Sequence, residues 1–470
     1  MVDMPQPTEA FSRRLKQTLI GSAHTPLVFL GNFEVEAQWG RDEPRLPQFS
    51  TDGAAAVVNA MDEFAVLLAG GDDHVVLARP PDEQYLRYLA DAGFDLPTVH
   101  VAAPLSIQRI QGGRTATVTD AVLADEVLLG RLAKLAEQGA MLLPHGVSTA
   151  EETLAAKTGL GLAAPCAQIC RHVNSKVYSR KVADELGLRQ PQGWTAESVD
   201  EFARLLPEAA ALLDTGRKVV VKEAFGVSGK GLQVIDSKQR LERLYRMIAK
   251  QAERTGNQHI AFIVESWVDK QTDLNYQCTV GLDGRASFDF VKEALTERGV
   301  HKGHIMPARL TDEVQAEVRT AAERIGERLA TDGYYGVVGV DALLDTSGRL
   351  YPVIEINARN NMSTYQARIQ ERLLAPGWWA MARHYPMRLS GPVGFGEVRA
   401  ALGDRLLTAP GRSGLVVNNF ATVNAAARAA EPFDGRLYGV VIAGSVEELD
   451  AIDADVTRRL ATLDGAVDGH

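Results

Sequence analysis

The chain of 470 residues contains little cysteine and no long apolar run. No stretch approaches the roughly 18–20 apolar residues that a membrane-spanning helix needs, and the N-terminus lacks the continuous apolar segment and cleavage site of a secretory signal. Cysteine occurs only at Cys166, Cys170 and Cys278, and this odd number argues against a disulfide framework. Cys166 and Cys170 have no further Cys or His at ligand spacing, which argues against a zinc site. We therefore predict a cytoplasmic protein with no membrane partner and with buried thiols.

Basic residues are fewer than acidic residues. The chain has 50 Lys and Arg against 60 Asp and Glu, a formal net charge of −10. It lacks the cationic surface of a non-specific nucleic-acid binder, so we expect no nucleic-acid partner, although a local basic pocket for a small phosphorylated ligand remains compatible with this charge. With 46% hydrophobic and 23% charged residues, the composition excludes a disordered or collagen-like chain. At about 150 residues per domain, the length predicts about three domains.

The pattern along the chain divides it into three blocks without internal repeats. In residues 1–150, short apolar runs alternate with helical periods, which favours an α/β layer. Strands are expected there at 25–30, 65–68 and 74–77, and helices at 11–20 and 79–92. Residues 151–390 contain the informative motifs. Residues 391–470 are interpreted as a small C-terminal α/β domain. Its elements are strands at 414–417 and 437–442 and a helix at 446–460. Neither flanking block contains a recognisable catalytic motif.

A glycine-rich loop joins two short strands in the middle block. Lys222 follows a β-branched run, and the loop Gly226–Gly231 leads to a second apolar run at 232–235. Backbone N–H groups of such a loop can approach phosphate oxygens closely, and lysines offset their charge. The spacing excludes a P-loop and a dinucleotide-binding fingerprint, because both of those open a helix. Taken alone, the loop fits either a hairpin lid over phosphates or a plain flexible turn.

Acidic and amide side chains interrupt two apolar runs that predict a β-hairpin. The runs span 337–344 and 350–357. Asp341 lies in the first run, and Glu355 and Asn357, two residues apart, share a face of the second. A tight turn would set Asp341 opposite Val353, on the same face as Glu355 and diagonal to it. A buried charge is costly unless it is paired or metal-bound, and these oxygen ligands suit Mg²⁺. We expect a magnesium site, with pairing to buried lysine or arginine as the alternative.

The order of the two hairpins resembles the ATP-grasp superfamily over roughly residues 170–370. The resemblance implies a mixed α/β and α+β fold. A pre-ATP-grasp α/β domain (1–150) and the small C-terminal domain (391–470) would flank an ATP-grasp core (151–390), whose glycine-lid subdomain lies at about 190–275. Enzymes of this superfamily use ATP to activate a carboxylate as an acylphosphate and then transfer the acyl group to an amine.

The resemblance also implies roles for individual residues. The lysines that would contact ATP phosphates are Lys176, Lys222 and Lys292. The lid would consist of Ser228, Gly229, Lys230 and Gly231. The backbone near Glu265 and Val268 would hold adenine, and Asp273 would bind the ribose, with Thr272 as the alternative. The magnesium ligands would be Asp341, Glu355 and Asn357.

Arginine positions depart from part of this family pattern. Relatives of the D-alanine–D-alanine ligase type have an arginine two residues before the first metal acid, where this chain has Gly339. The resemblance therefore leaves Arg359 or Arg309 to stabilise the γ-phosphate and the tetrahedral intermediate. The polar segment 296–309 is the best candidate for a substrate loop. Its His301 and His304 would be either bases for the incoming amine or exposed loop residues, and Arg309 could pair with a substrate carboxylate.

The domain plan further resembles the pheganomycin-type peptide ligases. This implies an ADP-forming ligase of antibiotic or other natural-product biosynthesis that uses ATP and Mg²⁺. It would join an amino acid, typically one not found in proteins, or another small carboxylate to the amine of an amino acid or peptide. The alternatives are a ligase for a small non-peptide metabolite and a non-catalytic ATP-binding regulatory protein. The oligomeric state, including a homodimer, stays open.

Overall fold

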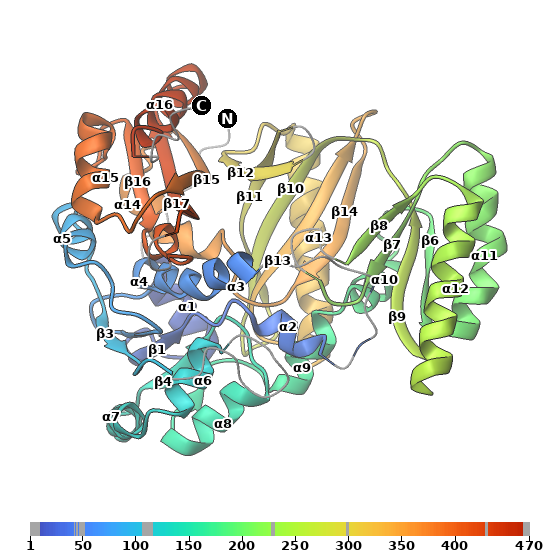
Figure 1. The fold of residues 1–470 in the computed structure, drawn as a ribbon, viewed down its shortest axis with the longest axis horizontal. Coiled ribbons are helices and arrows are strands. Elements are labelled where there is room, and N and C mark those ends of the chain that lie inside the picture. The colour runs from blue at the N-terminus through green and yellow to red at the C-terminus, as the bar shows by residue number, and fades with distance from the viewer. Residues whose placement is uncertain are drawn as a thin grey trace.

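Figure 1 shows the computed structural model, which describes residues 10–41, 43, 46, 52–105, 116–226, 231–297, 300–427 and 431–463. Its strands form a five-stranded, a four-stranded and an eight-stranded sheet. The five-stranded sheet lies at the lower left of the picture, the four-stranded sheet at the right, and the eight-stranded sheet runs from the centre to the upper left. No described helix combines the length and apolar character that a membrane crossing requires.

The five-stranded sheet is parallel, in the order β3-β2-β1-β4-β5. Its strands are β1 (Leu27–Leu30), β2 (His74–Leu77), β3 (Thr98–Val101), β4 (Met141–Pro144) and β5 (Gly161–Leu162). Helices α6 (Val118–Leu123), α7 (Glu126–Glu137) and α8 (Thr149–Thr158) share a hydrophobic core with β1, β2 and β4. The α/β layer expected for the first block is thus present. The strand expected at 65–68 is wrong, because these residues form helix α4 (Ala65–Leu68). All four side chains are buried, and so short an apolar run does not distinguish a buried helix from a buried strand.

The four-stranded sheet is antiparallel, in the order β6-β9-β7-β8. Its strands are β6 (Gly193–Ser198), β7 (Val219–Glu223), β8 (Leu232–Ile235) and β9 (His259–Ser266). Helices α11 (Val199–Asp214) and α12 (Lys238–Thr255) bury their apolar faces against it, at the far right of Figure 1. The glycine-loop hairpin expected between β7 and β8 is confirmed. The lid residues Ser228, Gly229 and Lys230 lie outside the described residues.

The eight-stranded sheet is also antiparallel, in the order β14-β13-β10-β11-β12-β15-β17-β16. Its strands are β10 (Lys270–Val280), β11 (Ala286–Glu297), β12 (Val300–Met306), β13 (Gly336–Asp345), β14 (Leu350–Asn357), β15 (Trp379–Leu389), β16 (Gly414–Asn419) and β17 (Phe433–Ala443). The last two strands belong to the third block. These two strands therefore extend the sheet of the core, and the small C-terminal domain at 391–470 stays a prediction.

Helix α13 (Asp312–Thr331) covers one face of this sheet through Val318, Ile325 and Leu329. Thr311 caps it by accepting a hydrogen bond from the Val314 N–H at 3.4 Å, as expected for an N-cap threonine. The opposite face carries polar side chains at its centre and packs against η2 (Thr364–Gln366) and α14 (Ala367–Leu373).

The remaining helices connect these layers. They are α1 (Phe11–Ile20), α2 (Val35–Trp39), α3 (Asp52–Asn59), α5 (Glu83–Asp91), α9 (Ala167–Val173), α10 (Lys176–Glu185), α15 (Phe395–Leu402) and α16 (Val446–Leu460), with 3₁₀ turns η1 (Ala60–Phe64), η3 (Gly403–Arg405) and η4 (Ala421–Val423). The cysteines are all free, but only Cys170 and Cys278 are buried, so the expectation of three buried thiols is wrong for the exposed Cys166.

Candidate functional site

A row of polar residues crosses four neighbouring strands of the eight-stranded sheet. Lys292 on β11 lies opposite Asn275 on β10, Asn275 lies opposite Asp341 on β13, and Asp341 lies opposite Glu355 on β14. Because directly opposite residues of antiparallel strands project to the same side, all four side chains share the face away from α13. The site therefore occupies the polar face of the large sheet.

The hairpin register differs from the one predicted. Asp341 pairs directly with Glu355 instead of lying opposite Val353. The ladder is irregular next to Asp341, since the next pair joins Leu343 to Tyr351 and leaves extra residues on β14. Such a bulge shifts the register beyond it, so a register counted from the turn is wrong by two residues at Asp341. The two carboxylates are closer than the predicted diagonal.

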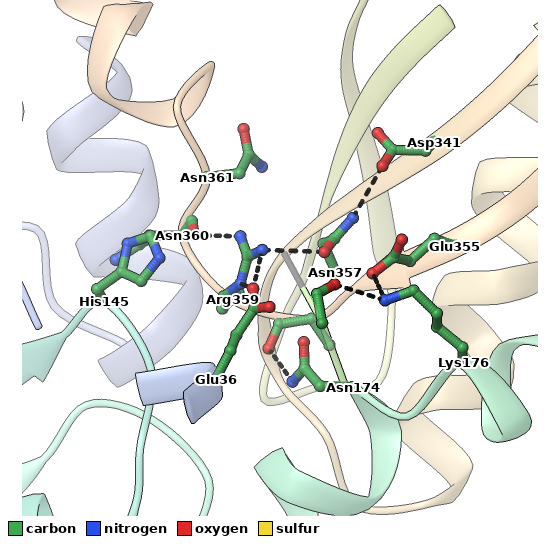
Figure 2. Close-up of polar contacts among 12 residues, drawn as sticks. Glu36, His145, Asn174, Lys176, Asp341, Glu355, Asn357, Arg359, Asn360 and Asn361 are labelled. Atoms are coloured by element: carbon green, nitrogen blue, oxygen red, sulfur yellow. Dashed lines mark hydrogen bonds and ion pairs between the residues drawn. The ribbon is translucent and has the colours of Figure 1, made fainter. Parts of the chain in front are cut away.

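The three expected metal ligands lie together (Figure 2). The Asn275 side-chain amide donates to Asp341 Oδ1 at 2.8 Å, and the Asn357 amide donates to Oδ2 at 3.4 Å. Burial, and next the charge of Glu355, raise the pKa of Asp341 to about 6. Lys176 at the start of α10 forms an ion pair with Glu355 at 2.6 Å and donates to the Gly226 carbonyl at 2.8 Å.

This set of side chains fits a magnesium ion. No three His, Cys, Asp or Glu side chains form a metal cluster among the described residues. The set instead combines two neighbouring carboxylates with one amide oxygen, which suits a hard cation that shares its other positions with water and phosphate. Burial of Asp341 and the adjacent Glu355 carboxylate both raise the pKa of Asp341, and a cation bound between the two carboxylates would stabilise their charges.

Arg359 connects this site to the first block of the chain. Its guanidinium donates to Asn357 Oδ1 at 3.0 Å and to Glu36 Oε1 at 2.6 Å, and Figure 2 shows it between the two. Glu36 belongs to α2, which follows β1. The first block thus contributes a charged partner to the site, although its sequence contains no catalytic motif. A single acid on a five-residue helix carries no pattern that would have revealed this contact.

The ion pair between Glu36 and Arg359 should be important for stability, because both side chains are nearly buried, at 11% and 12% exposure. We expect Glu36→Ala to lower the free energy of unfolding by about 3 kcal/mol, since it leaves a buried charge without its partner. Urea denaturation measures the loss. The exposed Glu137 at the end of α7 supplies a matched control, and Glu137→Ala should change stability by less than about 0.5 kcal/mol. Equal effects of the two substitutions would contradict the assignment.

A second charged group lies where the four-stranded sheet approaches the site. Lys222 on β7 and Arg180 on α10 both pair with Glu265 on β9, Arg180 at 3.2 Å. The Glu265 side chain therefore pairs with two cations of the protein. The adenine contact expected at this position uses the backbone, so it is compatible with this pairing. Arg180 was not identified from the sequence. A single arginine in a polar helix cannot be distinguished by its pattern from an arginine exposed to solvent.

The other expected nucleotide residues lie near the ends of strands. Val268 is half-buried two residues after the end of β9, and Asp273 at the start of β10 pairs with Lys270. Gly231 has φ +79°, and a Cβ there would lie 2.5 Å from Glu223 Oε2, so the end of the lid requires glycine.

Lys292 is the most deeply buried of the predicted site residues that the structure describes. It is 1% exposed, donates to Gln366 Oε1 at 2.9 Å and lies 4.6 Å from the centre of the Phe290 ring. Burial lowers its pKa to about 7. Within the described part of the chain, no acidic side chain pairs with its ammonium group.

Arg309 does not lie with this group in the structure, and its catalytic role stays a prediction. Its guanidinium makes two hydrogen bonds to Glu293, at 2.9 and 2.7 Å. Glu293 follows Lys292 on β11, and successive strand residues point to opposite faces, so Arg309 is held on the α13 side of the sheet. Nor could an arginine replace Gly339, because even a Cβ there would lie 2.6 Å from the Asn361 side-chain amide. Of the two histidines proposed as bases, His304 lies on the same face as Lys292, and the side chain of His301 lies outside the described residues.

Comparison with known families agrees with this geometry. Residues 61–160 match the pre-ATP-grasp domain and residues 181–364 match the ATP-grasp domain. The protein belongs to the ATP-grasp superfamily. Its ATP-grasp domain spans the four-stranded sheet and β10 to β14, and it therefore contains both hairpins.

Individual relatives are distant. The chain is 25% identical over 320 residues to the [Butirosin acyl-carrier protein]--L-glutamate ligase of Niallia circulans, covering 68% of each chain. It is 24% identical over 208 residues to pyruvate carboxylase 1 of Caenorhabditis elegans, of which it spans 16%. Among solved structures, N5-carboxyaminoimidazole synthetase from Staphylococcus aureus aligns with TM-score 0.51 and 12% identity, covering 93% of this chain and 97% of that one.

The biotin carboxylase domain of Hydrogenobacter thermophilus 2-oxoglutarate carboxylase, solved with MgADP, ADP and bicarbonate, aligns with TM-score 0.51 and 14% identity, covering 91% of this chain and 89% of that one. These alignments establish the ATP-grasp fold. The sequence matches place the protein among ATP-dependent ligases that act on carboxylates and amines.

Proposed function

We propose that the protein is an ADP-forming ligase that joins an amino-acid carboxylate to the amine of a peptide or amino acid through an acylphosphate. The observation that carries this proposal is the meeting of opposite charges at one face of the large sheet. Asp341 and Glu355 lie side by side there, Lys176 from α10 pairs with Glu355, and Arg359, just after β14, donates to the neighbouring Asn357. A site of this composition can hold a nucleotide triphosphate with its counter-cation.

In this structure, these charges neutralise one another. Lys176 pairs with Glu355, Lys222 with Glu265 and Arg359 with Glu36. On nucleotide binding, Lys176 and Lys222 would exchange a carboxylate partner for phosphate oxygens, which frees Glu355 as a ligand. Mg²⁺ held by Asp341, Glu355 and Asn357 would supply charge neutralisation at the phosphates.

The chain's own residues then have distinct tasks. Lys176 and Lys222 position the phosphate groups, and Lys292 faces the site from the same sheet surface and can accept an anion. The substrate carboxylate attacks the γ-phosphorus, which yields an acylphosphate and ADP, and an amine then displaces phosphate. Arg359, fixed by Glu36, would stabilise the oxyanion that forms in this second step. Phosphoryl transfer of this kind depends mainly on positioning and electrostatics.

The amine acceptor has two candidates. The resemblance to peptide ligases of natural-product biosynthesis favours a peptide or amino-acid amine. The relative from Niallia circulans carries a name that states ligation of L-glutamate to an acyl-carrier protein, which favours a carrier-bound acceptor and again a biosynthetic role. Both candidates use an amino acid as the acyl donor.

The test is acylphosphate trapping. The enzyme is incubated with ATP, Mg²⁺, hydroxylamine and one acid from a panel of amino acids, and ADP and hydroxamate are quantified. We expect acid-dependent formation of both in equal amounts, because hydroxylamine releases phosphate from an acylphosphate. Mass spectrometry after replacement of hydroxylamine by peptides or a carrier protein then identifies the acceptor. Absence of ADP and hydroxamate with every acid would favour the non-catalytic ATP-binding alternative.

A further inference from the structure

Helix α12 is basic, although the chain as a whole is acidic. Its 18 residues contain six basic and two acidic side chains, whereas the full chain has a formal net charge of −10. The helix covers one face of the four-stranded sheet at the far right of Figure 1. Its buried face consists of Leu241, Leu244, Ile248 and Ala252. The opposite face is therefore directed away from the sheet.

Four cations are aligned on this outward face. They recur at spacings of three, four and four residues, which places them in one row along the helix. We call this row the basic stripe, and it consists of Arg243, Arg246, Lys250 and Arg254. All four side chains are exposed. None of them forms an ion pair with a described residue, whereas the two basic residues in the first turn of the helix do.

Helix stability does not account for the basic stripe. Like charges four residues apart, as in the pairs that Lys250 makes with Arg246 and Arg254, destabilise a helix. Met247 lies within the row and is 46% exposed, and arginine and methionine are both enriched where proteins meet. The stripe therefore has the composition of a contact surface for an anionic partner.

One end of the stripe lies at the glycine-loop end of its subdomain. Strand β7 runs towards the loop and ends at Glu223, which lies opposite Phe262 on the antiparallel β9. Strand β9 begins beyond that pair, at His259, and α12 ends four residues earlier, at Thr255. Arg254 is therefore close to the end of the sheet at which β7 enters the glycine loop.

The stripe and the nucleotide residues lie on opposite sides of this sheet. Val221 packs into the core that α12 shares with the sheet, and Lys222, the next residue of β7, points to the other face. The stripe spans about 16 Å from Arg243 to Arg254, at 1.5 Å per residue. A free amino acid at the phosphate site therefore cannot contact it, and only a macromolecule could cover it.

We propose that the basic stripe docks an acidic face of a carrier protein to which the amine acceptor is attached. The inference rests on the proposed function and selects its carrier-bound acceptor over a free amino acid or a short peptide. Acidic side chains of the carrier would pair with the four cations, and Met247 would lie within the contact. Charge complementarity of this kind raises the rate of encounter and orients the partner. The acceptor would then reach the site past the glycine-loop end of the subdomain.

Charge reversal in the middle of the stripe tests this inference. A double variant, Arg246→Glu with Lys250→Glu, is compared with the wild type. The acceptors are glycinamide and a panel of acidic acyl-carrier proteins that bear a glycyl group, including the butirosin acyl-carrier protein. The variant should raise the KM for the carrier by about tenfold or more, with the KM for ATP and the kcat/KM for glycinamide unchanged. Added salt should weaken carrier recognition more in the wild type than in the variant, because salt screens exposed charges.

The matched control is a second double variant, Arg131→Glu with Lys134→Glu. Both residues are exposed on α7, at the lower left of Figure 1, and the net charge changes by the same amount. This variant should keep the wild-type KM for the carrier. An equal rise of this KM in both double variants, or no rise in the stripe variant, would overturn the docking site. Thermal unfolding checks that each variant is folded.

The other outcomes separate this inference from the proposed function. If the wild type joins acids to glycinamide but to no carrier, the ligase function stands and the docking inference is overturned. Dimers of the wild type that the stripe variant does not form would assign the stripe to a second copy of the chain, through exposed acids such as Asp200 and Glu208 on α11, and would also overturn it. Stripe-dependent binding of single-stranded RNA without binding of any carrier would do the same. If no acid yields a hydroxamate, the ligase function is contradicted, and the inference is overturned with it.

Discussion

Glu355→Gln should lower kcat for ADP formation by about a thousandfold or more, while the protein stays folded. The substitution keeps the size of the side chain and removes the charge that pairs with Lys176 and neighbours Asp341. Lys176 retains its hydrogen bond to the Gly226 carbonyl, so α10 should keep its position. The loss would come from the phosphate site, where a carboxylate ligand becomes a neutral amide.

The matched control for this variant is Glu317→Gln. Glu317 lies on the exposed side of α13, where it pairs with Arg189 at 3.8 Å, and an exposed pair of this kind contributes little. Steady-state ADP release under saturating ATP and Mg²⁺ measures both variants, and circular dichroism checks the fold. A Glu355→Gln enzyme that turns over as fast as Glu317→Gln would remove Glu355 from the metal site.

Lys292→Met should raise stability and abolish activity. Methionine has about the same length and carries no charge, so it removes the cost of a buried ammonium group. The pKa of Lys292 is about 7 in the folded protein, lowered by burial from an ordinary value of 10.5. Each pKa unit corresponds to about 1.4 kcal/mol, and we expect a gain of about 2 kcal/mol or more in the free energy of unfolding at pH 6.5.

The gain should depend on pH in a defined direction. Below pH 7, Lys292 is protonated in both the folded and unfolded states, and the folded protein bears the full cost of burying the charge. Between pH 7 and 10.5, the unfolded chain binds the proton and the folded protein releases it, so wild-type stability rises with pH relative to the variant. Urea denaturation at pH 6.5 and 9.5 should show a smaller gain at the higher pH. An equal gain at both, or a loss at pH 6.5, would contradict the account.

The chemistry of the site could be predicted further than its geometry. Asp341, Glu355 and Asn357 stand out because polar residues inside apolar strands need a partner, and the structure brings them together as expected. Their register was not predictable, because the irregular pairing next to Asp341 leaves no mark in a hydrophobic pattern. The lysines were identified by resemblance, and the structure adds the acidic partners of Lys176 and Lys222 and the amide partner of Lys292.

Contacts between distant segments could not be predicted. Glu36 meets Arg359 across 323 residues of chain, and Gln366 meets Lys292 across 74. Glu36 and Gln366 are single polar residues, and no hydrophobic pattern in the sequence around them indicates their distant partners. The joining of β16 and β17 to the core sheet was missed for a similar reason. The sequence predicts that a short apolar run will form a strand and pair with another strand. Which strand becomes its partner depends on which sheet edge is free in the folded protein.

The most direct test of the account is the trapping of an acylphosphate in wild type and Glu355→Gln side by side. With ATP, Mg²⁺, hydroxylamine and an amino-acid panel, the wild type should form ADP and hydroxamate in equal amounts with at least one acid, and Glu355→Gln should form neither. ADP release by the wild type that is independent of added acid, or equal hydroxamate formation by both proteins, would contradict a ligase whose phosphate site is built on Asp341 and Glu355.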